Sequence, residues 1–251
     1  MSEKFILLSY GRSGTGFINS TVGKYFNLHH TCEIELLGSC RAKMEKIQNP
    51  IKTIKNYYHT IKLKNPNDII YGFKWKPGYM YPNYNDLFLY LKNANIKIIV
   101  NYRNPIDKII SNIKLKEIGT SAHYKKHHNR KIVKKIRQDK IYIPTKDLIE
   151  NLKQLINNMK EYIKLLKQYE ISYLEVNYED LSDKNIEKWS TLLNFLVKDK
   201  VNINKLNYIL DNPKYIKVMK KSHYEIISNY NEVSEVLKDT PYDQYLTKII
   251  K

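Results

Sequence analysis

The sequence predicts an α/β protein with three α/β/α layers, in which helices cover both faces of a central parallel sheet. Short strand-like segments alternate along the chain with segments of helical periodicity, which is the pattern of a parallel sheet. Two strand-like segments, residues 5–8 and 96–102, are dominated by apolar residues, as expected for strands buried on both faces. With 251 residues the chain has the length of one large domain, and we expect a single domain over residues 1–251.

Each element is predicted from its hydrophobic period, and turn residues mark its boundaries. Apolar residues at every third or fourth position indicate helices, and alternating β-branched and aromatic residues indicate strands. Residues 120–143 have the weakest pattern, and small helices and loops are expected after Val201. The expected elements are strand 5–8, helix 17–26, helix 35–47, helix 51–63, strand 69–75, helix 85–93, strand 96–102, helix 105 to at least 113, helix 145–168, strand 171–176 and helix 183–196.

The composition favours anionic partners. The net charge is +18, but only five of the 43 basic residues are arginine, so the position of each arginine is informative. No apolar run is long enough to span a membrane, and the first residues lack the pattern of a signal peptide. The two cysteines cannot build a disulfide framework. We therefore expect a cytoplasmic protein without a membrane span.

A glycine-rich turn between the first strand and the first helix is the strongest functional signal. The segment YGRSGTGF places three of the chain's eight glycines within six residues. Glycine lets the backbone bring N–H groups close to a ligand, and a helix N-terminus attracts an anion. One arginine and two hydroxyl side chains add further donors. The predicted anion-binding residues are Gly11, Arg12, Ser13, Gly14, Thr15 and Gly16.

This turn is not a Walker A phosphate loop, because Phe17 stands where that loop has its lysine. It resembles the 5′-phosphosulfate loop of sulfotransferases, in which a proline or glycine and a basic residue precede Ser-Gly-Thr-Thr. The resemblance implies a P-loop NTPase-like form of the predicted fold. Gly16 departs from the family pattern, which has Thr, Ser or Asn there, so one hydroxyl donor is missing. An ordinary strand–turn–helix joint is the alternative for this stretch alone.

A second motif begins where the second buried strand ends, at Arg103. Asn104 is a good N-cap, Pro105 suits the first helical position, and Asp107 lies in the first turn. Ser111 follows Arg103 by a little over two helical turns, so one anion could meet both side chains. This Arg-x-Pro-x-Asp-x-x-x-Ser pattern resembles the 3′-phosphate site of sulfotransferases. Alone, it is also compatible with a helix start beside a surface arginine.

Two further segments resemble the same family. Residues 174–181, LEVNYEDL, are similar to a late strand that ends in Tyr-Glu-Asp-Leu. Residues 73–75, FKW, are similar to the strand before the acceptor pocket of some bacterial carbohydrate sulfotransferases. The motifs stand in the family's order, and together they are more specific than any one of them. The C-terminal segment typical of the cytosolic branch is absent, so the likeness is closer to the bacterial and carbohydrate-type enzymes.

The resemblance implies an enzyme that uses 3′-phosphoadenosine 5′-phosphosulfate (PAPS) as co-substrate, without a metal. It would transfer a sulfuryl group to a hydroxyl or amine of a small-molecule or carbohydrate acceptor. By the same resemblance, Arg12 would stabilise charge on the leaving oxygen and Lys74 would assist. The implied general base is a glutamate soon after the first helix, where Glu33 stands, with Glu35 and His30 as alternatives.

Two other function classes remain open. A nucleotide or small-molecule kinase would share the fold but lacks the Walker lysine. A basic nucleic-acid-binding module is the non-enzymatic alternative, yet few aromatic residues accompany the lysines of residues 123–140, so nucleic acid is not the expected partner. His123 and His127 have a spacing seen in metal sites, but no further ligand type completes a set, so no metal is predicted. No motif indicates which acceptor is used or the oligomeric state.

Overall fold

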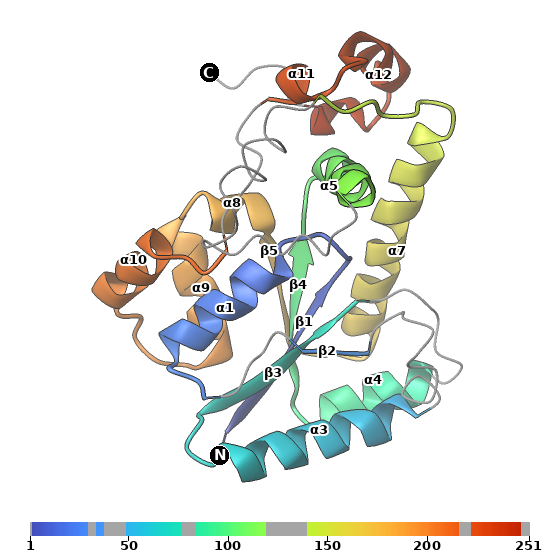
Figure 1. Ribbon diagram of the computed structural model, residues 1–251. Coiled ribbons are helices and arrows are strands. Elements are labelled where there is room, and N and C mark those ends of the chain that lie inside the picture. The colour runs from blue at the N-terminus through green and yellow to red at the C-terminus, as the bar shows by residue number, and fades with distance from the viewer. Residues whose placement is uncertain are drawn as a thin grey trace. The chain divides into compact units, whose positions relative to one another are not determined.

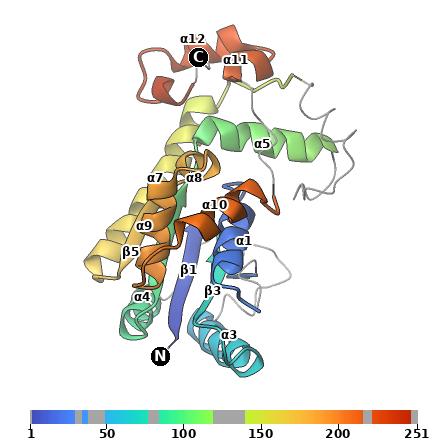
Figure 2. The ribbon, with the colours of Figure 1, turned by 90° about the vertical axis from the view of Figure 1, so that its left-hand side faces the viewer.

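The computed structural model describes residues 2–29, 34–37, 49–76, 84–118, 140–215 and 222–246. The chain divides into two compact units, whose elements are drawn in Figures 1 and 2. The first unit combines Met1–Tyr102 with Ile163–Lys214, and the second combines Arg103–Tyr162 with Tyr215–Lys251. A single domain over the whole chain stays a prediction. No helix within the described ranges is both long enough and apolar enough to cross a lipid bilayer.

A five-stranded sheet forms the centre of the first unit (Figure 1). Its strand order is β2-β3-β1-β4-β5, and every neighbouring pair is parallel. The strands are β1 Glu3–Ser9, β2 Glu35–Leu37, β3 Ile70–Trp75, β4 Lys97–Tyr102 and β5 Tyr173–Asn177. The first predicted strand, β1, lies in the middle of the sheet and is buried from Phe5 to Ser9. The predicted α/β class with a central parallel sheet is confirmed.

Helices cover both faces of this sheet. On one face, Leu7 shares a hydrophobic cluster with residues of α1, α9 and α10. On the other face, Phe73 contacts Tyr58 of α3, and Trp75 lies against Phe88 of α4. The helices of the first unit are α1 Thr15–Tyr25, α3 Pro50–Lys64, α4 Tyr84–Asn93, α8 Tyr178–Ser182, α9 Ile186–Leu196 and α10 Ile203–Asp211. The predicted three-layer arrangement therefore holds within this unit.

One predicted helix is wrong at its start. The chain forms the edge strand β2 where a helix at 35–47 is expected. Leu36 and Leu37 are buried, and β2 pairs with β3, so sheet pairing overrides a short helical pattern. Residues 38–47 of that prediction lie outside the described residues. The other predicted strands and helices are confirmed, with ends that differ by at most three residues.

The second unit is helical and has its own apolar core. Ile106 and Ile110 share a buried cluster with residues of the other helices of this unit. Ile141 and Ile227 form an isolated parallel bridge. Residues 119–139, most of the segment with the weakest pattern, lie outside the described residues. The elements are α5 Pro105–Ile118, α11 His223–Ile226, α12 Tyr230–Leu237, the 3-10 helix η2 Asp243–Tyr245 and the first part of α7 Leu148–Gln168.

Candidate functional site

The strand order reverses at the carboxyl ends of β1 and β4. From β1 the chain leads toward β2 at one edge of the sheet, and from β4 it leads to β5 at the other edge. Ligands of open α/β sheets bind outside the strand ends at such a point. Ser9 of β1 and Asn101 of β4 are paired in register there. The predicted glycine loop begins directly after Ser9, between β1 and α1 (Figure 1).

Two residues of this loop have left-handed backbone conformations. The φ angle is 68° at Arg12 and 73° at Gly14. A non-glycine residue in this region costs about 1–2 kcal/mol, and such strain clusters at functional sites. Arg12 precedes a helix, whereas the other described non-glycine residues with positive φ each follow the end of a helix, where this conformation is a common cap. Those residues are Asn27, Asn95, Glu170, Lys184 and Asp239.

The loop ends at the N-terminus of α1. Gly14 is the N-cap residue, and glycine has no side chain that could cap this end. The N–H groups of Phe17 and Ile18 donate to the Gly14 carbonyl at 3.0 and 3.3 Å. Thr15 and Gly16 occupy the first two helical positions, where a backbone N–H group has no acceptor inside the helix. With the left-handed residues before them, these N–H groups make a suitable site for an anion.

Asn101 holds the loop from the neighbouring strand. Its side chain is buried, and Nδ2 donates to the Ser13 carbonyl at 2.6 Å and lies 3.4 Å from Ser9 Oγ. Among the described residues, none donates a hydrogen bond to Asn101 Oδ1. The sequence prediction missed this residue. A polar side chain inside the apolar run 96–102 is the signal that could have revealed it.

The ring of Tyr178 packs against the loop from the end of β5. A Cβ atom at Gly14 would lie 2.1 Å from Cδ2 and Cε2 of this ring, so only glycine fits there. Tyr178 also meets Phe17 edge to face, with ring centroids 6.3 Å apart. Phe17 meets Trp189 of α9 in the same way at 5.7 Å. The Tyr-Glu-Asp-Leu segment, singled out by resemblance alone, thus begins with a residue that contacts the loop.

Two of the predicted catalytic residues lie in the first unit at the carboxyl ends of strands. Arg12 belongs to the loop, and Lys74 is the second-last residue of β3. Lys74 is buried and pairs in register with Leu7, so its side chain is on the face of the sheet that α1 covers. The structure therefore places both residues at the loop end of the central strands.

Of the three candidate general bases, the structure describes only Glu35. Glu33 and His30 lie outside the described residues. Glu35 is the first residue of β2, and its carboxylate forms an ion pair with the Lys76 ammonium group. The role predicted for Glu33 stays a prediction.

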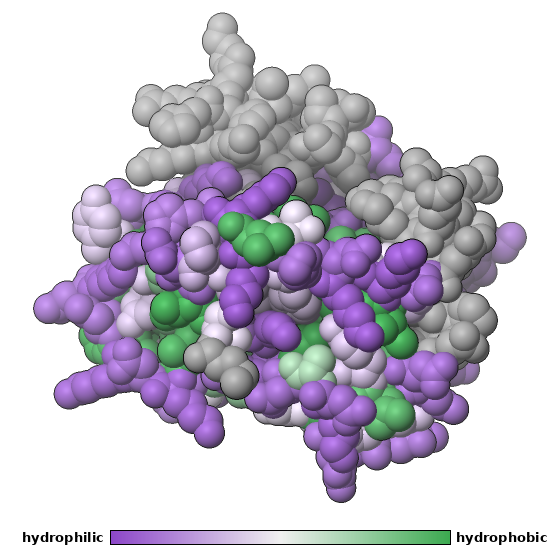
Figure 3. All heavy atoms as spheres, turned by 90° about the horizontal axis from the view of Figure 1, so that it is seen from below, coloured by the Kyte–Doolittle hydropathy of each residue, from purple (hydrophilic) through white to green (hydrophobic). Residues whose placement is uncertain are grey.

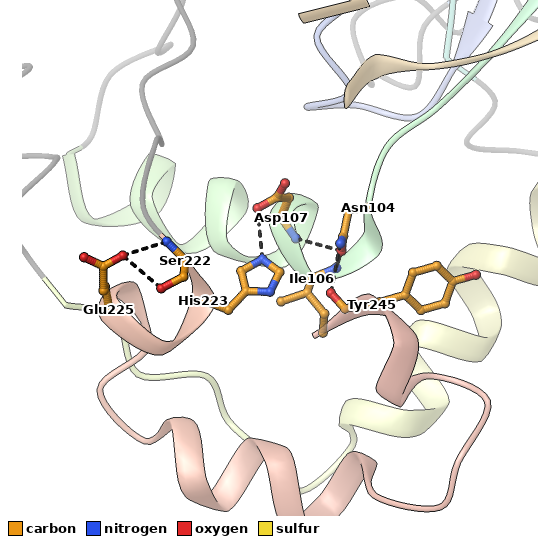
Figure 4. A network of polar contacts seen from close by, with 7 residues as sticks. All are labelled: Asn104, Ile106, Asp107, Ser222, His223, Glu225 and Tyr245. Carbon is orange, nitrogen blue, oxygen red and sulfur yellow. Dashed lines mark hydrogen bonds and ion pairs between the residues drawn. The ribbon is translucent and has the colours of Figure 1, made fainter. Parts of the chain in front are cut away.

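Arg103 and Ser111 belong to the second unit, at the start of α5 and within it. That Arg103 and Ser111 bind one anion stays a prediction. Their neighbours in the motif have structural partners, which Figure 4 shows. Asn104 accepts a hydrogen bond from the Ile106 N–H at 2.9 Å and donates to the Tyr245 carbonyl at 2.8 Å.

The acid of the motif also has a structural partner. Asp107 Oδ1 lies 3.1 Å from Nε2 of His223, a buried residue of α11. Next to His223, Ser222 and Glu225 form a capping box that begins α11 (Figure 4). These contacts join α11 to the first turn of α5.

Two ionisable groups near the end of β4 in the sequence have shifted pKa values. Tyr102 donates to Glu175 Oε2 at 2.7 Å, and burial together with this hydrogen bond raises the pKa of Tyr102. Its phenol is therefore a neutral donor at physiological pH. In the second unit, burial lowers the pKa of Lys108 to about 8. Within the described ranges, no three His, Cys, Asp or Glu side chains gather in an arrangement that could hold a metal ion.

Comparisons with known proteins find similar structures. No protein-family model matches the sequence, and no curated protein matches it. The chain is similar in structure to sulfotransferases. One match is the sulfotransferase domain from the curacin biosynthetic pathway, with a TM-score of 0.43 and 17% identity over 98% of this chain and 89% of that chain. Another is mouse sulfotransferase SULT7A1 complexed with PAP, with a TM-score of 0.45 and 14% identity over 97% and 88%. At these identities the similarity concerns the fold alone.

Proposed function

We propose that this chain is a sulfotransferase, which moves a sulfuryl group from PAPS to a hydroxyl or amine of a small-molecule or carbohydrate acceptor. The main support for this proposal is the loop between β1 and α1. It lies at the switch point of the sheet, Arg12 has a strained left-handed backbone, and the N-cap residue of α1 is a glycine. These features suit a phosphate or phosphosulfate group.

The position of Phe17 favours sulfuryl transfer over phosphoryl transfer. A Walker A loop has a lysine at this position, which reaches the β- and γ-phosphates. Here the ring of Phe17 lies against Tyr178 and Trp189, at the edge of the main hydrophobic cluster. A kinase would lack its essential cation, whereas the sulfotransferase pattern has its basic residue earlier, where Arg12 stands.

The residues of the chain would act mainly by binding and by stabilising charge. The N–H groups of residues 13–16 would hold the 5′ end of PAPS, and Arg103 and Ser111 would hold its 3′-phosphate. Arg12 would stabilise negative charge on the leaving oxygen, with Lys74 assisting. PAPS supplies the sulfuryl group when it is bound.

The acceptor must lose a proton during the transfer, and Glu33 is our proposed base. Its position soon after α1 in the sequence supports this role. Glu35, whose carboxylate is paired with Lys76, and His30 are the alternatives.

Calorimetry with adenosine 3′,5′-bisphosphate, AMP and ATP tests the proposal. The bisphosphate should bind at least about tenfold more tightly than AMP, because Arg103 and Ser111 add a charge-assisted contact. Arg103→Ala should remove about 1.5–3 kcal/mol of bisphosphate affinity and leave AMP affinity nearly unchanged. Arg12→Gly is the matched variant. It should change the affinity for AMP and for the bisphosphate by the same factor, because the loop binds the 5′ end that they share.

Two results would contradict the proposal. The first is equal affinity of the wild-type chain for AMP and the bisphosphate. The second is preference for ATP or for a short oligonucleotide, the latter with a steep dependence on salt that marks nucleic-acid binding. Thermal unfolding of each variant separates loss of binding from loss of the fold.

A further inference from the structure

A hollow of about 370 Å³ lies at the end of the first unit where β1 begins. The glycine loop leaves the other end of β1, so the hollow and the loop lie at opposite ends of the central strand. Figure 3 views the molecule from below, and hydrophilic side chains prevail on its described surface. The lining comes from the start of β1, α3, β3 and the end of α4, and it includes Lys4, Lys55, Tyr58, His59, Lys62 and Tyr71.

The charges that line this hollow are mainly positive. Lys4, Lys55 and Lys62 form no ion pair with any carboxylate in the described part of the chain. The one acid in the lining is Glu3, and its Oε2 lies 3.1 Å from Nζ of Lys97. Because Lys97 offsets the charge of Glu3, the lysines give the hollow a positive potential. Concave surfaces strengthen such a potential and raise the local concentration of counter-ions.

Tyrosine rings hold two of the lysine side chains. Nζ of Lys4 lies 5.7 Å from the ring centroid of Tyr58, and Nζ of Lys55 lies 5.3 Å from that of Tyr90. Both distances are within the range of a cation–π interaction. The Tyr58 hydroxyl is already used, since it donates to the Phe5 carbonyl at 2.8 Å. The rings therefore position ammonium groups at the hollow, which lowers the entropy that these side chains lose on binding a ligand.

We propose that this hollow binds a small organic dianion of the phosphate-monoester type. Ligand pockets range from about 300 to 1,000 Å³, so a volume of about 370 Å³ suits a compact ligand such as a sugar phosphate. Three ammonium groups match a dianion better than a monoanion, because each adds a charge-assisted hydrogen bond. The hollow shares no lining residue with the glycine loop, so the inference does not rest on the proposed sulfotransferase activity.

Calorimetric titration with glucose 6-phosphate tests the inference on the full chain. Saturable binding is expected at low ionic strength, and the double variant Lys55→Ala/Lys62→Ala should weaken it about tenfold or more. Lys52→Ala/Lys64→Ala is the matched control, since both of these exposed lysines belong to α3 and neither lines the hollow. It removes the same charge from the same helix and should weaken binding less than about twofold.

Further titrations separate this site from the loop. Glucose 6-sulfate, a monoanion, should bind more weakly than glucose 6-phosphate, and glucose should not bind. The Arg12→Gly variant should bind glucose 6-phosphate like the wild-type chain, because the glycine loop lies at the other end of β1. Equal losses of glucose 6-phosphate affinity in the two double variants, the absence of saturable binding, or loss of binding in Arg12→Gly would each overturn the proposal.

Discussion

The two units use asparagine side chains for different purposes, although Asn101 and Asn104 are only three residues apart. In the first unit, Asn101 is buried at the end of β4 and donates to the Ser13 carbonyl, which fixes a loop. In the second unit, Asn104 caps α5 and donates to the Tyr245 carbonyl, which fixes a helix and a 3-10 turn. One side chain thus supports a candidate binding site, and the other supports the packing of helices.

This difference changes how the Arg-x-Pro-x-Asp-x-x-x-Ser motif is interpreted. Asn104 caps the helix, Pro105 is its first residue, and Asp107 contacts the buried His223. Two defined positions of the motif, Pro105 and Asp107, and its variable position Asn104 therefore have structural roles that any helix start could share. The proposed nucleotide contacts of the motif depend on Arg103 and Ser111.

The largest effect is expected at Gly14. Gly14→Ala would place a Cβ atom 2.1 Å from the Tyr178 ring on a backbone with φ of 73°, so the free energy of unfolding should fall by about 2–4 kcal/mol. Gly11→Ala is the matched change, because its Cβ atom meets nothing within 4 Å. Its free energy of unfolding should change by less than about 1 kcal/mol. Urea denaturation of both variants provides the measurement.

The Gly11 variant also sharpens the functional comparison. If an anion occupies the space beside Gly11, Gly11→Ala should weaken binding of adenosine 3′,5′-bisphosphate while the fold stays intact. Equal destabilisation by the two alanine substitutions would show that the contact with Tyr178 does not hold the loop.

A middle-sized effect is expected from removing either asparagine side chain. Asn101→Leu removes the donor to Ser13 but also removes a buried Oδ1 that no described residue satisfies, so stability should change by about 1 kcal/mol or less. Affinity for adenosine 3′,5′-bisphosphate should fall about tenfold, because the loop loses its support. Asn104→Ala removes a helix cap and should lower the free energy of unfolding by about 1–2 kcal/mol.

Calorimetry and thermal unfolding together decide this prediction. Unchanged nucleotide affinity in Asn101→Leu would show that the loop keeps its shape without the side chain. A larger loss of stability in Asn101→Leu than in Asn104→Ala would reverse the assignment of roles.

The sequence predicted the sheet well because the apolar runs of β1 and β4 are each long enough to indicate a buried strand. It predicted the loop because Gly11, Gly14 and Gly16 are clustered. It failed at β2, a three-residue strand whose conformation depends on pairing with β3. Local periodicity cannot show such long-range pairing.

The supports of the candidate site were also hidden from the sequence. The contact of Tyr178 with Gly14 joins residues 164 positions apart, and it depends on β5 and β1 lying on either side of β4. The hydrogen bond from Asn101 to Ser13 depends on the register of β4 with β1. Motifs therefore indicated the candidate anion-binding residues, but only the strand order shows which residues hold them in place.

A further effect concerns the charge of Lys108 in α5. Burial lowers the pKa of Lys108 to about 8, from the model-compound value of 10.5. Between these values the unfolded chain binds more protons than the folded chain, so the Lys108 contribution to stability rises with pH across this window. Below pH 8 the charged side chain imposes its full desolvation cost. Lys108→Met keeps an apolar stem without the charge, and it should raise the free energy of unfolding at pH 7 by about 1–2 kcal/mol.

The advantage of Lys108→Met over the wild-type chain should shrink as the pH rises from 8 to 10.5, because the wild-type lysine then loses its proton in the folded state. Lys116→Met is the control on the same helix, since Lys116 is exposed. It should change stability by less than about 0.5 kcal/mol at either pH. Urea denaturation at pH 7 and pH 10 measures both variants. An advantage of Lys108→Met that is the same at both pH values would mean that the added apolar surface, and not the removed charge, stabilises α5.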